Sequence, residues 1–103
     1  MPEVSEHTLP ADHETDLTGQ WVSKRRKVVG DATTNRIEWL IGNHLVLLGR
    51  DASGMSELYR DPASGKLWEL TWPQPEMHGG GPPRLTQIEV ASARAKYGSL
   101  ADG

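Results

Sequence analysis

The stretch Glu57-Leu58-Tyr59-Arg60-Asp61-Pro62-Ala63-Ser64-Gly65-Lys66-Leu67-Trp68-Glu69-Leu70-Thr71-Trp72 decides the fold of this chain. Its two ends are rich in apolar and β-forming residues, and Asp61-Pro62-Ala63-Ser64-Gly65 between them has the composition of a turn. Proline presets the backbone angle that a turn needs, and glycine accepts a positive φ. The pattern predicts a β-hairpin with strands over residues 57–60 and 67–72.

The second strand of this hairpin has one strongly apolar face. Successive side chains of a strand point to opposite faces of a sheet, so Trp68, Leu70 and Trp72 share one face. Pro73 ends the strand, because proline cannot donate a hydrogen bond to the ladder. We therefore expect Trp68, Leu70 and Trp72 to belong to the core.

On the N-terminal side, the sequence predicts a second hairpin followed by a helix. Residues 20–24 and 27–29 suit two strands on either side of a charged tip, Lys24-Arg25-Arg26-Lys27. Asp31 is a suitable N-cap for a helix in which apolar residues recur at helical spacing. The pair Gly42-Asn43 predicts a left-handed stop to that helix.

Three further elements complete the predicted fold. Residues 45–48 are aliphatic at consecutive positions and suit a strand covered on both faces. Residues 84–88 suit a returning strand, and residues 90–97 suit a helix that Gly98 ends. The prediction is an α+β fold: a small, mostly antiparallel sheet of four to five strands, with a helix after the first hairpin and a C-terminal helix. We expect both helices on one face of the sheet, which leaves the other face to a partner.

Length and charge predict one folded domain with a disordered N-terminal tail and a frayed C-terminus. The chain has 103 residues, of which 36% are apolar, and this supports one modest core. Residues 1–16 hold five acidic residues and no Lys or Arg, so they are predicted to be a disordered acidic tail. Residues 17–98 are the predicted α+β domain, and residues 99–103 are expected to fray.

Composition also limits location and chemistry. The chain has no cysteine, which excludes disulfides, thiolate metal sites and a thiol nucleophile. The N-terminus has neither a basic nor an apolar leader segment, and the longest aliphatic run is Leu45–Leu48, so we expect a cytoplasmic protein without an anchor. The four histidines are not spaced as metal ligands, and we predict no metal and no cofactor.

The segment Glu76-Met77-His78-Gly79-Gly80-Gly81-Pro82-Pro83 is the least ordinary in the chain. Its His-Gly-Gly-Gly run is similar to the oxyanion loop of some esterases, but the chain has no Gly-x-Ser-x-Gly motif to supply the nucleophile. It could instead cradle an anion, although the lysine pattern of phosphate loops is absent. We favour a loop in which the glycines adopt backbone angles closed to other residues and the prolines restrict the chain.

Two other groups of residues invite a binding role. The basic quartet Lys24–Lys27 could contact nucleic acid, but the overall pI of about 5.7 favours a solvated tip that keeps the edge strand from pairing. Trp and Tyr are enriched in binding hot spots, and the chain has four Trp and two Tyr. Most of these six belong to the core, and Tyr59, Trp39, Glu69 and Arg60 are candidates for an exposed contact face.

Several segments together resemble the immunity protein 27 family of bacterial polymorphic-toxin systems. They span most of the chain from residue 17 to residue 98 and are Leu17-Thr18-Gly19-Gln20-Trp21-Val22, Asp31 with Arg36-Ile37, Leu58-Tyr59-Arg60-Asp61-Pro62, residues 65–74, residues 76–85 and Ala95-Lys96-Tyr97-Gly98. The chain departs from the expected pattern at Arg25-Arg26, where smaller turn residues are usual, and at Glu89, where a Ser or Thr N-cap is usual.

The resemblance implies an α+β immunity protein, without catalytic activity, that binds and neutralises a cognate bacterial toxin domain in the cytoplasm. It implies a toxin protein as partner, without nucleic acid or membrane, and a monomer when free. The predicted contact residues are Tyr59, Arg60, Glu69, Trp72, Glu76, His78, Gly79, Gly80 and Gly81. The alternative is a small ligand-binding or hydrolytic domain that uses the His-Gly-Gly-Gly loop.

Overall fold

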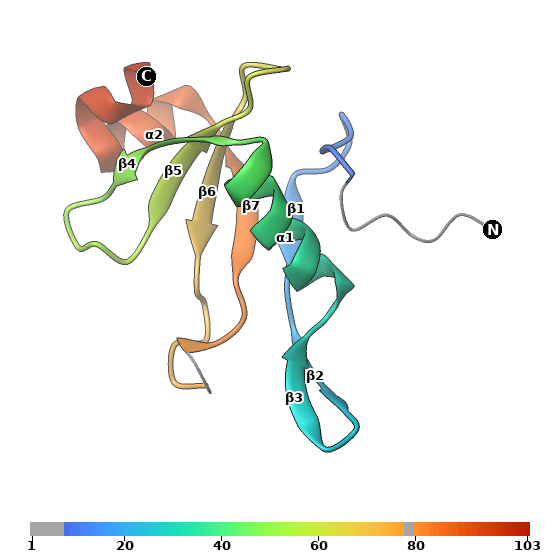
Figure 1. Cartoon of the computed structure of the whole chain (residues 1–103). Coiled ribbons are helices and arrows are strands. Elements are labelled where there is room, and N and C mark those ends of the chain that lie inside the picture. The colour runs from blue at the N-terminus through green and yellow to red at the C-terminus, as the bar shows by residue number, and fades with distance from the viewer. Residues whose placement is uncertain (1–7, 78–79) are drawn as a thin grey trace.

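The computed structural model describes residues 8–77 and 80–103 and confirms the α+β fold (Figure 1). Five antiparallel strands form one sheet in the order β1-β7-β6-β5-β4, and β2 and β3 form a separate two-stranded hairpin. The elements are β1 (Asp16–Thr18), β2 (Trp21–Lys24), β3 (Lys27–Gly30), α1 (Ala32–Asn43), β4 (Val46–Arg50), β5 (Glu57–Arg60), β6 (Leu67–Thr71), β7 (Arg84–Ile88), α2 (Val90–Tyr97) and the 3-10 helix η2 (Gly98–Asp102).

Strands β5 and β6 form the hairpin that the turn residues predict, and both lie inside the sheet rather than at its edges. Glu57 pairs with Leu70 at one end and Arg60 with Leu67 at the other. In the turn, the Asp61 carboxylate accepts a hydrogen bond from the Ala63 N–H at 2.8 Å. Gly65 adopts the positive φ of +77° that a side chain would oppose.

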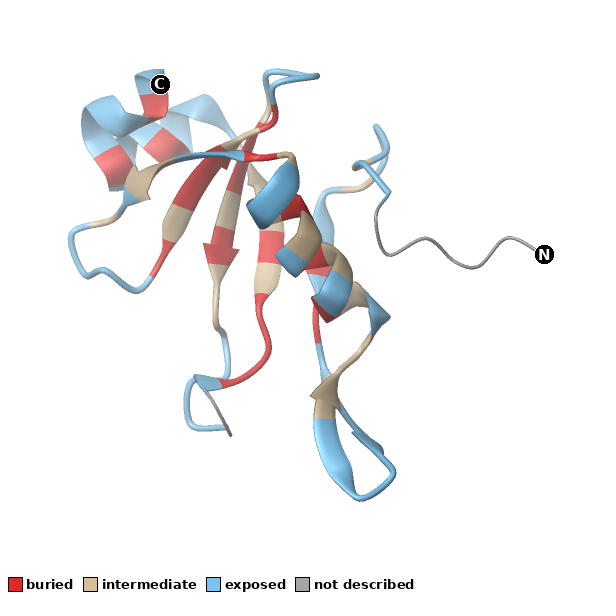
Figure 2. Ribbon diagram, in the orientation of Figure 1, coloured by how far each residue is buried: buried red, intermediate tan, exposed pale blue. Residues whose placement is uncertain are grey.

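The two helices lie against opposite faces of the sheet, which corrects the prediction that they share one face. Buried residues fall into two clusters, and the alternation of β6 divides them: Trp68 and Leu70 belong to the first, and Leu67 belongs to the second. The prediction considered only one apolar face of β6. Leu58 and Leu67, at 0% and 5% exposure, belong to the second cluster, so the other face of the sheet also requires a cover. Figure 2 shows buried residues along the central strands β5 and β6.

Each cluster is centred on one helix. The first cluster packs α1 onto the sheet and consists of Leu17, Ile37, Leu40, Leu45, Tyr59, Trp68, Leu70 and Leu85. The second packs α2 and η2 onto the other face and consists of Leu58, Leu67, Ala93, Tyr97 and Ala101.

The first helix begins where the sequence predicts and ends later than predicted. The Asp31 carboxylate accepts a hydrogen bond from the Thr34 N–H at 2.8 Å and so caps the helix. The left-handed stop expected at Gly42-Asn43 is wrong, because α1 continues through Asn43 and its C-cap is His44 at a φ of −126°. His44 Nε2 lies 2.8 Å from Asp61 Oδ1, which ties this end of the helix to the central hairpin.

The C-terminal residues are packed where the sequence led us to expect fraying. Gly98–Asp102 form η2, and Ala101 is 8% exposed within the second cluster. Strand β4 makes room for this turn at Gly49, because a Cβ there would lie 2.6 Å from Leu100 Cδ1. Arg94 Nε and Asp102 Oδ1 add an ion pair at 2.9 Å.

Part of the predicted acidic tail contacts the domain. The Arg36 guanidinium of α1 donates hydrogen bonds to both oxygens of Glu14 at 2.7 Å, and its Nε donates to the Thr8 carbonyl at 2.9 Å. Residues 1–7 of the predicted tail lie outside the described residues. The described part of the tail is therefore held by Arg36 through one carboxylate and two backbone carbonyls, and its last residue, Asp16, pairs with Arg84.

We expect the stabilisation from the Glu14–Arg36 pair to be lost as the pH falls from about 4.5 to about 2. The Arg36 hydrogen bond lowers the pKa of Glu14 from 4.5 to about 2. Because the folded pKa is the lower one, the stabilisation is complete above the unfolded pKa and disappears as the folded carboxylate is protonated. Urea unfolding of the wild type and of Glu14→Gln should differ by about 1 kcal/mol at neutral pH and converge near pH 2. A difference that stays constant across this range would contradict the assignment.

Candidate functional site

The predicted contact residues do not gather in one place. Trp72 follows β6, and Glu76, Gly80 and Gly81 lie in the segment between β6 and β7, at one end of the sheet. Tyr59, Arg60 and Glu69 lie within the strands. His78 and Gly79 lie outside the described residues. The predicted set as a whole therefore stays a prediction, and its described members belong to different surroundings.

Two of the three strand residues of this set, Tyr59 and Glu69, are bonded inside the domain. Tyr59 is 5% exposed, and its hydroxyl donates to Glu57 Oε1 at 2.8 Å; burial and this neighbouring carboxylate raise the pKa of Tyr59. Glu69 faces α2, where it accepts hydrogen bonds from the Tyr97 hydroxyl at 2.8 Å and from Lys96 Nζ at 2.6 Å. These contacts attach α2 to the sheet.

In the glycine-proline segment, residues 76–83, the described residues adopt a conformation that depends on Gly80 and Gly81. The Met77 N–H donates to the Gln74 carbonyl at 3.1 Å, and the Gly80 N–H donates to the Met77 carbonyl at 3.0 Å. Gly80 and Gly81 adopt φ values of +88° and +83°, as expected for glycines in angles closed to other residues. A Cβ on Gly81 would overlap the Gln74 carbonyl oxygen, so this glycine also allows a close backbone contact.

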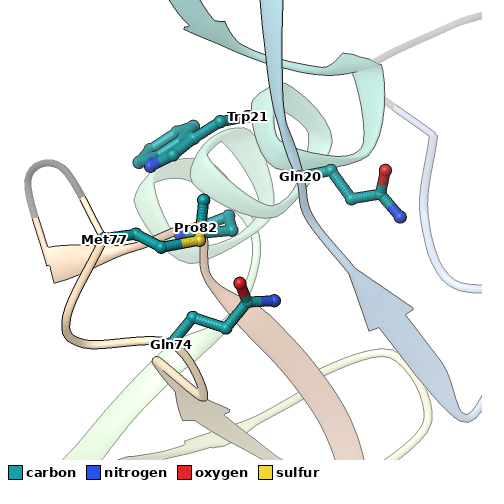
Figure 3. Close-up of a pocket in the computed structure, with 5 residues that line it drawn as sticks. All are labelled: Gln20, Trp21, Gln74, Met77 and Pro82. Carbon is teal, nitrogen blue, oxygen red and sulfur yellow. The ribbon is translucent and has the colours of Figure 1, made fainter.

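This segment and the base of the β2–β3 hairpin enclose a groove, which we call the Trp21 groove. One part of it, of 190 Å³, is lined by Gln20, Trp21, Gln74, Met77 and Pro82 (Figure 3). The adjoining part, of 180 Å³, is lined by Trp21, Ile37, Glu38, Ile41, Leu70, Trp72, Gly81 and Pro83. Trp21 borders both parts, so this indole divides the groove.

Backbone hydrogen bonds position Trp21. The Gly19 N–H donates to the Pro83 carbonyl at 2.8 Å, and the Asp31 N–H donates to the Gln20 carbonyl at 2.9 Å. A Cβ on Gly19 would overlap the Thr34 hydroxyl, so a glycine is needed for this approach to α1. The two sides of the groove are therefore connected directly, in addition to their connection through the sheet.

The chemistry of the Trp21 groove suits contact more than reaction. Its walls include two indoles, two prolines, three aliphatic side chains, a thioether and two amides, and Glu38 is the only acidic residue among the described ones that line it. Within residues 8–77 and 80–103, no three His, Asp or Glu side chains come together as metal ligands. The Gly80 amide, which the anion-cradle alternative would use, already donates to Met77.

Of the residues that line this groove, the predicted contact set contains only Trp72 and Gly81, and it missed all five residues of the first part: Gln20, Trp21, Gln74, Met77 and Pro82. Gln20 and Trp21 are more than fifty positions from the glycine-proline segment, and they meet it because β1 pairs with β7. The run Gly19-Gln20-Trp21 between two strands was the available signal, since a glycine before an aromatic residue indicates a close backbone approach.

A family model described as Immunity protein 27 matches residues 23–89. The match begins in β2 and ends after β7, and it includes the helix α1, the central hairpin and the glycine-proline segment. Neither the curated proteins nor the solved structures contain a significant match to the chain.

Proposed function

Because the chain belongs to the immunity protein 27 family, we propose that it binds a cognate bacterial toxin domain in the cytoplasm and blocks it. The family match over residues 23–89 carries this proposal. Such a protein acts by occupying a surface of its toxin, so it needs no catalytic group and no cofactor of its own. In the ranges 8–77 and 80–103, no helix is long and apolar enough to cross a membrane.

We propose the Trp21 groove and its rim as the toxin-binding surface, in place of a site spread over all the predicted contact residues. Indole side chains combine a large contact area with a polar group and are frequent in binding hot spots. Trp21 and Trp72 supply two of them, and Met77 stands at the rim at 36% exposure. Each part of the groove is small enough to be filled by one side chain of a partner.

The stiffness of this surface supports the same assignment. Gly81, Pro82 and Pro83 are buried, and the Gly19 N–H donates to the Pro83 carbonyl at 2.8 Å, which connects this side of the groove to the other. A surface that is ordered before binding loses less conformational entropy when a partner docks. The free protein, which we propose to be a monomer, can therefore bind without rearranging the groove.

The test is binding to, and protection from, the toxin encoded beside this gene. We expect Met77→Ala to weaken binding more than tenfold, because it removes an apolar contact at the rim of the groove. Met55→Ala is the matched control: Met55 is 61% exposed and lies in the loop between β4 and β5, away from the groove. Isothermal titration calorimetry on both variants measures the difference.

Two outcomes would contradict these proposals in separate ways. A chain that neither binds its genomic neighbour nor protects cells expressing it would refute the function. Tight binding that Met77→Ala and Met55→Ala weaken equally, or leave unchanged, would refute the groove as the contact surface.

A further inference from the structure

The hairpin of β2 and β3 carries a basic tip that nothing in the described structure neutralises. The hairpin stands apart from the five-stranded sheet (Figure 1), and the residues of its tip, Lys24-Arg25-Arg26-Lys27, are all exposed (Figure 2). None of these four cations forms an ion pair with any residue in the ranges 8–77 and 80–103. The tip therefore offers four uncompensated positive charges on a projecting arm.

The backbone of this tip is unfavourable for the residues that it carries. Arg25 and Arg26 adopt φ values of +52° and +68°, the left-handed conformation at both central positions of a two-residue turn. Asn and Gly are the usual residues there, because other side chains crowd the backbone. A tip that needed only solubility would combine Asn-Gly with the two flanking lysines. Strain that is retained at an exposed site points to a function for the residues that cause it.

One face of the β2–β3 hairpin combines lysine side chains with aliphatic side chains, which form an apolar floor. Val22 pairs with Val29, and Lys24 pairs with Lys27, so these four side chains share a face. Val22, Lys24 and Val29 line an open groove of 570 Å³, and its other wall is the start of α1. Trp21 lies on the opposite face, by the same alternation. The face thus presents two lysines beside an apolar floor.

From these observations we propose that the β2–β3 hairpin is a docking arm for an acidic surface of the toxin. The inference rests on the proposed function and deepens it by naming the chemistry of the partner surface. The four cations would face carboxylates of the toxin, and Val22 with Val29 would contact aliphatic side chains between them. A folded acidic protein fits this face better than a nucleic acid, because the chain as a whole has a net charge of −3 and the valine face offers no aromatic ring for base stacking.

The test measures the charge of the tip and its backbone strain by two different readouts, the association rate and the Tm. The double variant Arg25→Asn with Arg26→Gly removes two charges and introduces the residues that this turn favours. We expect its Tm to rise by about 4–8 °C and its association rate with the toxin to fall about tenfold at low salt. The wild-type rate should fall towards that of the variant as salt rises from about 0.02 M to about 0.5 M.

The matched control removes two charges elsewhere. Arg50 and Arg94 have side chains that are 64% and 62% exposed, each in an ion pair away from the hairpin. Arg50→Gln with Arg94→Gln should leave the association rate within about twofold of the wild type, because rate effects depend on charges near the contact.

Three results would overturn the inference. Equal association rates for the wild type and both double variants would refute the docking arm and leave the proposed function intact. Salt-sensitive binding of random-sequence DNA or RNA that only the hairpin variant loses, with toxin binding unchanged, would assign the arm to nucleic acid. Absence of toxin binding by the wild type at both salt concentrations would refute the proposed function, and this inference with it.

Discussion

Gly81→Ala is expected to lower the free energy of unfolding by at least about 3 kcal/mol, a larger loss than Gly80→Ala in the same loop. Gly81 has a φ of +83°, which opposes a side chain by about 1–2 kcal/mol. The added Cβ would also overlap the Gln74 carbonyl oxygen, which is backbone and can move only with the loop. The displacement would open the Trp21 groove, so toxin binding should be lost together with stability.

The neighbouring glycine provides the control. Gly80 has a similar φ of +88°, but a Cβ there would meet no atom of the described residues within 4 Å. Gly80→Ala should therefore cost only the backbone strain, about 1 kcal/mol, and leave the groove in place. Urea unfolding and calorimetric titration with the toxin measure both variants. Similar losses in the two would show that strain alone, and not the contact with Gln74, decides the effect.

Trp68→Ala is expected to lower the free energy of unfolding by about 3–5 kcal/mol. Trp68 is 1% exposed and is the largest fully buried side chain, in the cluster that packs α1 onto the sheet. Its removal leaves a cavity that the surrounding strands and helix cannot fill without moving. For a domain of this size, such a loss is a large part of the total stability.

Trp68→Phe distinguishes the volume of this side chain from its polar group. The Trp68 indole nitrogen is buried and has no hydrogen-bond partner among the described residues. An unpaired buried donor is unfavourable, so replacement of the indole by an apolar ring removes one penalty while it creates a smaller cavity. We expect Trp68→Phe to cost about 1 kcal/mol in urea unfolding. A loss as large as that of Trp68→Ala would show that the indole nitrogen has a partner.

Elements with local signals were predicted well from the sequence. The strands at residues 57–60 and 84–88 and the helix at residues 90–97 have the predicted bounds, and the strand predicted at 67–72 ends one residue earlier. Proline, glycine and side-chain alternation affect only a few neighbouring residues, so a single sequence is enough to predict the bounds of these elements. Strand β1 was missed because three residues are too few to show an alternation.

The arrangement of these elements depends on contacts that no local pattern contains. Leu58 and Leu67 occupy the second face of two strands whose first face is already apolar, and only the packed structure shows that both faces are covered. Likewise, Gly19 approaches Pro83 only because β1 lies beside β7, and this pairing creates the Trp21 groove. The predicted contact residues in the strands were chosen by residue type, without knowledge that Tyr97 and Lys96 already bind Glu69.

The pairing of Asp16 with Thr86 in strands β1 and β7 also affects how the protein is made. A ribosome synthesises β1 among the first strands, but β1 can join the sheet only when β7 has emerged, seventy positions later in the register. A nascent chain that stops before Arg84 lacks the strand between β1 and β6. If the protein acts as proposed, translation products that lack β7 would not protect the cell, and protection would begin only after β7 has been synthesised.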